Sequence, residues 1–271
     1  MKTVTSKDGT TIAFDQSGTG QPLIMIPGAF GYSKFPGSLE LAALLSSDFT
    51  FINYDRRGRG ESGDTQPYAV AREIEDIEAL IDAVGGSAFL GGMSSGAILA
   101  LEAANQFPGK VKKLALYEPP FIINDSRPPL PSDFVQQLKD AVTAGRPGDA
   151  IDIIMTHALR IPAEQLAPMR HDPLWPEMIK VAPTLVYDGT IQADFMAGKP
   201  LPRDRWTHVN FPTLVMNGET SDQFFKDGAQ ALVDLLPNAQ HRIVEGQNHN
   251  ISMKVLAPVL KMFFQLEGDL T

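Results

Sequence analysis

The sequence predicts an α/β fold, with a doubly wound, mostly parallel sheet and an inserted helical cap. Short apolar runs alternate with amphipathic helical patterns, and several of these runs are apolar at every position, as strands covered on both faces are. One long stretch, residues 121–206, has helical patterns and many prolines but no convincing core strand. We therefore expect a core domain, residues 1–120 and 207–271, and a cap, residues 121–206.

The predicted strands are short apolar runs that end at turn residues. The run at 23–26 ends at Pro27-Gly28, and the run at 241–244 is more polar, which is typical of an edge strand. A lone G-x-G at residues 18–20 lacks the third glycine and the following helix of a dinucleotide site, so it is interpreted as a turn. The predicted strands cover residues 11–14, 23–26, 49–54, 88–90, 114–117, 213–216 and 241–244.

The helices are predicted from apolar residues that recur every three or four positions. In the helix at 70–84, the acidic residues, Glu73 and Asp76 among them, are expected away from the apolar face. Further helices are predicted at 97–107, 230–236 and 255–266.

Composition excludes several classes of protein. The chain has 271 residues, 43% of them hydrophobic, and a formal net charge of −9, which makes nucleic acid a poor partner. It has no cysteine, so disulfides, thiol nucleophiles and cysteine metal sites are excluded. Since no secretory signal or membrane-length apolar run is found, we expect a cytoplasmic protein without membrane insertion. Its expected partner is a small-molecule substrate, and a homo-oligomer is left open.

Residues 92–96 read G-M-S-S-G, a G-x-S-x-G motif between a predicted strand and a predicted helix. A sharp strand-to-helix turn would lift the Ser94 hydroxyl into the open, and glycine fits at positions 92 and 96 because larger side chains would collide there. Without catalysis, the same segment would be a glycine-rich turn with a serine cap. We expect Ser94 to be a nucleophile, and the backbone N–H of Ser95, rather than its hydroxyl, to matter.

Two other loops supply the partners that a nucleophilic serine needs. The loop at 27–31 ends an earlier buried strand and is expected to give an oxyanion hole one N–H, from Ala29 or else Phe30, beside that of Ser95. His249 lies between the last strand and the last helix, where a general base can reach the same end of the sheet. The remaining histidines are less well placed: His157, His171, His208 and His241.

These motifs resemble the α/β-hydrolase superfamily. Residues 55–62 read D-R-R-G-R-G-E-S and match a D-x-R-G-x-G-x-S segment of that superfamily. The resemblance covers nearly the whole chain outside the cap and implies a serine mechanism, but it does not specify a substrate. Arg56, Arg57 and Arg59 are interpreted mainly as structural support for this segment rather than as a phosphate or carboxylate site.

The third member of the triad has two candidates. The superfamily usually places an acid at the position held here by Ser221, so Asp222 comes one residue late; Glu118, directly after the strand at 114–117, is the alternative that some members use. Asp222 could instead cap the helix that begins near Phe224, and Glu118 could pair with an arginine. We slightly favour Glu118, because its position needs no insertion.

The sequence therefore predicts a carboxylesterase-like serine hydrolase that cleaves an ester, lactone or related acyl bond of a small, largely apolar molecule through an acyl-enzyme, with no cofactor and no metal. Cofactor-free haloperoxidase or perhydrolase activity, C–C bond hydrolysis, and a non-catalytic ligand-binding role on the same fold remain alternatives. Apolar cap residues are expected mainly in packing, and some of them in the pocket: Phe121, Phe134, Met155, Met169, Trp175, Met178, Phe195, Met196 and Trp206.

Overall fold

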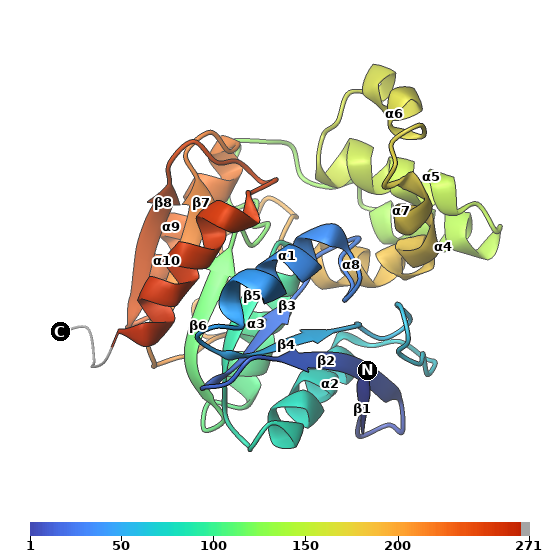
Figure 1. Ribbon diagram of the computed structural model, residues 1–271. Helices are drawn as coiled ribbons and strands as arrows, with labels where there is room; N and C mark the ends of the chain where they lie inside the picture. Colours follow the sequence, from blue (N-terminus) through green and yellow to red (C-terminus); the bar gives the residue numbers. More distant parts are fainter. Residues whose placement is uncertain (267–271) are drawn as a thin grey trace.

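The computed structural model describes residues 1–266, which form one sheet of eight strands flanked by helices (Figure 1). The strand order is β1-β2-β4-β3-β5-β6-β7-β8, antiparallel where β2 pairs with β1 and β4 and parallel elsewhere, so the predicted doubly wound, mostly parallel sheet is confirmed. The strands are β1 (Lys2–Thr5), β2 (Thr11–Ser17), β3 (Pro22–Ile26), β4 (Thr50–Tyr54), β5 (Ala88–Met93), β6 (Val111–Tyr117), β7 (Thr213–Gly218) and β8 (Ala239–Val244).

Helices cover both faces of the sheet. Apolar side chains of α2, α3 and α9 pack on one face, and those of α1 and α10 pack on the other. This two-sided cover explains why the central strands are apolar at consecutive positions. The helices are α1 (Pro36–Leu45), α2 (Val70–Ala83), α3 (Ser95–Gln106), α9 (Gln223–Leu235) and α10 (Met253–Gln265).

Between β6 and β7 the described chain forms helices only. In Figure 1, α4 to α7 lie together to one side of the sheet, and α8 lies between them and the core. These inserted helices are α4 (Phe134–Thr143), α5 (Pro147–Ile153), a π-helical turn (Ile154–Ala158), α6 (Ala163–Met169), α7 (Trp175–Val181), a 3₁₀ turn (Ala182–Thr184) and α8 (Leu185–Gln192).

The apolar residues expected in the cap divide between different clusters. Phe121, Phe195 and Trp206 pack in the cluster formed by the sheet with α2, α3 and α9. They therefore have the packing role that was expected for most of these residues. Phe134, Met155 and Met178 belong to a second cluster that also contains Phe30 and Tyr32 of the loop after β3. The inserted helices are therefore joined to the core at the carboxyl end of β3.

Some sequence predictions are incomplete. No strand was assigned to β1 and no helix to α1, and Glu73 and Asp76, which were expected away from the apolar face of α2, are nonetheless buried (2% and 1% exposed). Both carboxylates bind arginines of the segment after β4. Within residues 1–266, no helix combines the length and apolar character needed to cross a bilayer.

Candidate active site

Ser94 occupies the turn between β5 and α3. Its backbone has φ 52° and ψ −127°, a conformation that residues with a side chain rarely adopt. Its N–H donates a 2.9 Å hydrogen bond to the carbonyl of Tyr117, which ties the turn to the neighbouring strand β6. The turn thereby holds the Ser94 side chain, half-buried, at the carboxyl end of the sheet.

Close backbone contacts require the two glycines of the motif. A Cβ added at Gly92 would lie 2.4 Å from the carbonyl oxygen of Gly96, and one added at Gly96 would lie 2.4 Å from that of Ile26. These separations are too short for real side chains, so the strained turn at Ser94 forms only with glycine on both sides. This is the steric reason that the sequence motif predicted.

The loop after β3 touches the turn at Ser94. A Cβ added at Gly28 would lie 3.0 Å from Cβ of Ser94, and Phe30 in the same loop has a positive φ of 66°. Within residues 1–266, no hydrogen bond occupies the backbone N–H of Ala29 or of Ser95. Unoccupied N–H groups beside a nucleophile are the donors that an oxyanion hole needs.

Glu118 and His249 form a hydrogen-bonded pair. Glu118 directly follows β6, has a positive φ of 47°, and is fully buried. Its Oε2 lies 2.7 Å from Nδ1 of His249, while its Oε1 accepts hydrogen bonds from the N–H of Gly218 (2.7 Å) and the hydroxyl of Ser221. An ionised carboxylate only accepts, so the Nδ1 of His249 carries the hydrogen and Nε2 is the basic nitrogen.

The His249 loop is fixed from two directions. The hydroxyl of Tyr117 donates a 2.6 Å hydrogen bond to the carbonyl of Asn248, next to the histidine. The ring of Phe225 stacks on the imidazole, with centroids 4.5 Å apart and planes 13° apart. Because Ser94, Tyr117 and Glu118 share the adjoining ends of β5 and β6, these contacts bring the histidine loop to the end of the sheet that carries the serine.

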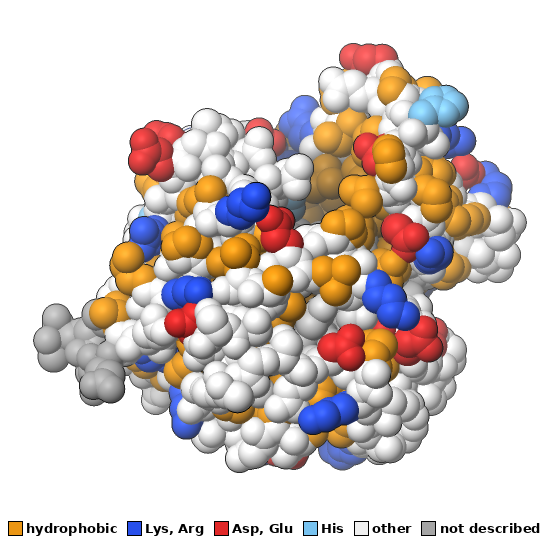
Figure 2. Space-filling view, viewed as in Figure 1, with side chains coloured by type: hydrophobic (Ala, Val, Ile, Leu, Met, Phe, Trp, Pro, Cys, Tyr) orange, Lys and Arg blue, Asp and Glu red, His pale blue; other side chains and the backbone are white. Residues whose placement is uncertain are grey.

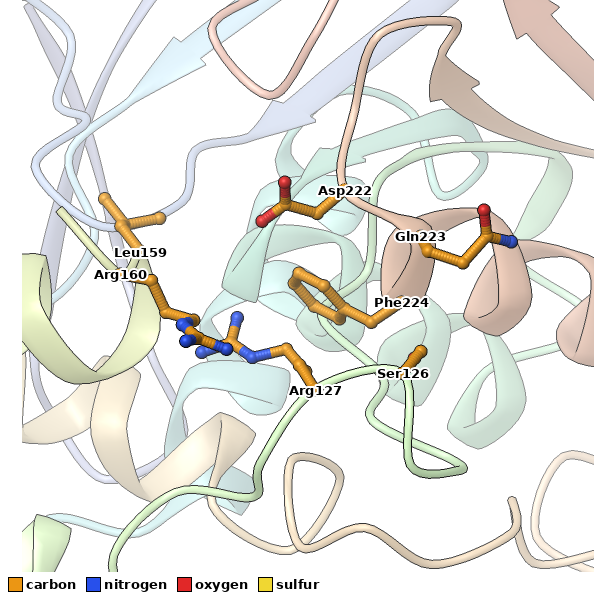
Figure 3. Close-up of a pocket in the computed structure, with 7 residues that line it drawn as sticks. All are labelled: Ser126, Arg127, Leu159, Arg160, Asp222, Gln223 and Phe224. Carbon is orange, nitrogen blue, oxygen red and sulfur yellow. The ribbon is translucent and has the colours of Figure 1, made fainter.

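Of the two candidate acids, the structure brings Glu118 and not Asp222 to His249. Asp222 is exposed at the N-cap position of α9, where its side chain makes no capping hydrogen bond, and it lines a separate pocket (Figure 3). Ser221, at the position where the superfamily usually has its acid, donates its hydroxyl to Glu118 instead. One serine therefore fills the usual acid position and hydrogen-bonds the acid on the adjacent strand.

A buried ionic network supports the loop after β3 and the turn at Ser94. Arg59 donates to the carbonyls of Gly28 (2.8 Å) and Gly31 (3.0 Å), and it also binds Asp188 of α8. Asp188 accepts a 2.7 Å hydrogen bond from the hydroxyl of Ser95. The Ser95 hydroxyl, which the sequence analysis considered unimportant, thus links the turn at Ser94 to the inserted helices.

Asp188 was missed in the sequence because its partners are distant along the chain. It also binds Arg56, which in turn binds Glu73, and all of these groups are buried. Burial alone would raise the pKa of Asp188, but the charges of Arg56 and Arg59 hold it below its ordinary value. The only signal was indirect, since buried arginines require buried acidic partners. Arg56, Arg57 and Arg59 therefore serve as structural support, as expected.

In residues 1–266, no group of three or more histidine, aspartate or glutamate side chains is arranged to hold a metal ion. The arrangement can perform nucleophilic chemistry: a strained serine turn, N–H groups beside it, and an imidazole oriented by a buried carboxylate.

Comparisons with known proteins agree with this architecture. A crystal structure of an alpha/beta hydrolase from Sphaerobacter thermophilus has a TM-score of 0.89 and 45% identity, covering 97% of this chain and 100% of that one. An esterase from Rhodococcus sp. ECU1013 has a TM-score of 0.71 and 21% identity, covering 98% and 99% of the two chains, which shows the fold alone. A non-heme haloperoxidase from Rhodococcus erythropolis is 24% identical over 265 residues, 93% of each chain.

The model of the alpha/beta hydrolase family matches residues 23–257, which include the serine turn, the acid and the histidine. The chain belongs to the alpha/beta hydrolase family.

Proposed function

We propose that this protein is a serine hydrolase that cleaves a carboxylic ester, lactone or related acyl bond through an acyl-enzyme. The observation that carries the proposal is the 2.7 Å contact between Nδ1 of His249 and Oε2 of Glu118, at the end of the sheet that holds Ser94 in its strained turn. A buried carboxylate that orients an imidazole at the same end of the sheet as a serine in a strained turn is the arrangement that activates a hydroxyl in such enzymes.

In the first half of the reaction, Oγ of Ser94 attacks the acyl carbon while Nε2 of His249 takes its proton. The N–H groups of Ala29 and Ser95 stabilise the negative charge that develops on the carbonyl oxygen. Nε2 then gives the proton to the leaving oxygen as its bond to the acyl carbon breaks. The leaving alcohol is released, and the acyl group stays esterified to Ser94.

In the second half, a water molecule attacks the acyl-enzyme. Nε2 of His249 removes a proton from the water and returns it to Oγ of Ser94 as the ester bond breaks. Glu118 keeps its negative charge throughout, orients the ring through Nδ1, and stabilises the imidazolium while it exists.

The surroundings favour an acyl compound with an apolar part. Phe30 and Tyr32, next to Ala29, pack in one cluster with Phe134, Met155 and Met178 of the inserted helices. Figure 2 shows hydrophobic side chains gathered around the hollow between these helices and the core. We propose that the inserted helices form a cap and that its apolar side chains bind this part of the substrate.

A second candidate is cofactor-free perhydrolysis or haloperoxidase activity, which the relative described as a non-heme haloperoxidase favours. In this alternative, hydrogen peroxide replaces water in the second half, and the product is a peroxy acid. Measuring halide oxidation with acetate and peroxide, next to ester hydrolysis, distinguishes the two: perhydrolysis that exceeds hydrolysis under matched conditions would favour the alternative.

The roles of the two acids are tested by paired substitutions. We expect Glu118→Gln to lower kcat for p-nitrophenyl esters by several orders of magnitude, since removing the orienting acid of a triad costs about 10⁴ in kcat. Asp222→Asn tests the other candidate acid, because it makes the same chemical change one residue from Ser221 but outside the hydrogen bonds to His249. Near-full activity in Glu118→Gln together with a large loss in Asp222→Asn would reverse the assignment.

A substrate scan tests the reaction class. We expect hydrolysis of p-nitrophenyl esters of increasing chain length and of simple lactones by the wild-type protein, and none above background by Ser94→Ala. Equal rates in the two proteins, with both folded by circular dichroism, would show that the serine is not the nucleophile.

A further inference from the structure

A pocket of about 460 Å³ lies between the inserted helices and the core, beside the residues that hold the His249–Glu118 pair. Figure 3 shows the side chains of Arg127 and Arg160 meeting from different segments, with Phe224 beside them and Asp222 on the opposite wall. The pocket is lined by Ser126, Arg127, Leu159, Arg160, Asp222, Gln223 and Phe224. Neither the triad nor the proposed oxyanion hole uses these arginines.

Arg127 is held in a fixed position. It is only 6% exposed, and its two terminal nitrogens donate to the carbonyls of Ala158 (3.0 Å) and His157 (2.8 Å) at the end of the π-helical turn. Its guanidinium carbon lies 4.5 Å from the centre of the Phe224 ring. Its Nε is buried and has no hydrogen-bond partner. Each terminal nitrogen carries two hydrogens, so these backbone contacts do not exhaust its donors.

Arg160 brings a second positive charge to the same pocket. It is exposed and has a positive φ of 55°, two residues after the end of the π-helical turn. Strained backbone and π-helical turns both concentrate at functional sites. Among residues 1–266, neither Arg127 nor Arg160 forms an ion pair, although other arginines of the chain do.

The two guanidinium groups repel each other. Burial and, next, the charge of Arg160 lower the pKa of Arg127 to about 10, and Asp222 offsets this only in part. Among the described residues that line the pocket, these two positive charges face a single carboxylate, that of Asp222, so the lining carries a net charge of plus one. An anionic ligand would remove the repulsion and use the free donors.

The pocket is connected to the catalytic histidine through two aromatic contacts. Phe224, which lines the pocket, lies 3.9 Å from Phe225 between ring centroids, and Phe225 stacks on His249. Asp222 directly follows Ser221, which donates to Glu118. Two residues of the pocket, Phe224 and Asp222, are therefore next in sequence to the residues that contact His249 and Glu118.

We propose that Arg127 and Arg160 bind a carboxylate, so that the substrate is an acyl compound with a second, anionic carboxylate away from the bond that is cleaved. This inference rests on the proposed hydrolase function, because it names the substrate class of that same site. The planar guanidinium matches a carboxylate with two parallel hydrogen bonds, which a neutral chain end cannot form.

The test compares two esters of equal chain length, mono-p-nitrophenyl adipate and p-nitrophenyl hexanoate, through the ratio of their kcat/KM values. We expect the wild-type ratio to favour the anionic ester, and Arg160→Gln to lower that ratio by about tenfold or more, as loss of a charged hydrogen bond does. Arg203→Gln, the same change at an exposed arginine that does not line the pocket, is the control and should leave the ratio unchanged. A ratio in Arg160→Gln within about twofold of the wild-type ratio would overturn the proposal.

A binding measurement separates failure of the subsite from failure of the hydrolase assignment. If the wild-type protein hydrolyses neither ester, calorimetry with adipate still tests the pocket. Weaker binding in Arg160→Gln by about tenfold or more, with unchanged binding in Arg203→Gln, would support the carboxylate site without hydrolysis. Equal affinities in all three proteins, or no binding to any, would overturn it. Arg127→Gln is a second variant, but its loss of two backbone contacts makes Arg160→Gln the primary one.

Discussion

Replacing Asp188 with asparagine should lower both stability and kcat, because this carboxylate joins three parts of the candidate site. It accepts hydrogen bonds from Arg56 and from the hydroxyl of Ser95, each at 2.7 Å, and from Arg59. Arg59 in turn holds the carbonyls of the loop that carries Ala29. Both segments that supply the proposed oxyanion donors are therefore attached to one buried side chain.

The size of the effect follows from burial. Asp188 is fully buried, and Arg56 and Arg59 are each 1% exposed, so water cannot replace the lost charge. Removing one partner of a buried ion pair costs about 3–5 kcal/mol, which is the expected drop in the free energy of unfolding. Loss of one oxyanion donor costs ~10²–10³ in kcat, and since the donors would be displaced rather than removed, we expect a decrease of about 10–100-fold.

Urea unfolding followed by circular dichroism measures the first effect, and ester hydrolysis at a temperature where the variant is folded measures the second. Asp76→Asn is a matched control: Asp76 is also buried and binds Arg57 through two hydrogen bonds of 2.8 and 2.7 Å, but it does not contact the loop after β3. It should lose stability and keep kcat near the wild-type value. An unchanged urea midpoint in Asp188→Asn, or equal losses of kcat in both variants, would refute the reasoning.

Two further predictions concern single hydrogen bonds. Ser221→Ala removes one of the donors to Glu118, and because a hydrogen bond to a charged group contributes about 1.5–3 kcal/mol, kcat should fall about tenfold or more; steady-state rates equal to wild type would contradict a positioning role. Burial alone would raise the pKa of Asp8, but hydrogen bonds from Thr10 and Arg57 lower it to about 2. Because this folded-state pKa lies below the ordinary aspartate value of 3.8, Asp8 stabilises the fold above that pH, and its contribution is lost as the pH falls towards 2. Asp8→Asn should therefore be less stable at pH 7 by about 1–2 kcal/mol and match the wild type near pH 2; a difference independent of pH would contradict this.

Local patterns were enough to predict the sheet, except β1, and the strand-to-helix turn at Ser94. Strands buried on both faces have no solvated positions, so their residues are apolar without interruption. The G-x-S-x-G spacing marks positions without room for a side chain: Gly92 lies against Gly96 within the motif, and Gly96 lies against Ile26 of β3. The edge character of β8 followed from its more polar residues in the same way. Glu118 was predicted as one of two candidates, because a strand end places a side chain at the edge of the sheet whatever its partner is.

The remaining features depend on contacts between distant segments. Glu73 and Asp76 lie off the apolar face of α2 by their spacing, and only the arginines after β4 explain their burial. Asp188 is 93 residues from Ser95, so no local period marks it. Position 221, where the superfamily usually has its acid, holds a serine, and Glu118 contacts His249 instead. This arrangement likewise depends on the pairing of β6 with β7, which places Glu118 next to Gly218 and Ser221.

The most direct test of the serine nucleophile is labelling of the folded protein with a fluorophosphonate probe, followed by mass spectrometry of its peptides. We predict one adduct per chain, on the peptide that contains Ser94, and none in Ser94→Ala. Folded wild-type protein that stays unlabelled, or an adduct that persists in Ser94→Ala, would contradict the assignment.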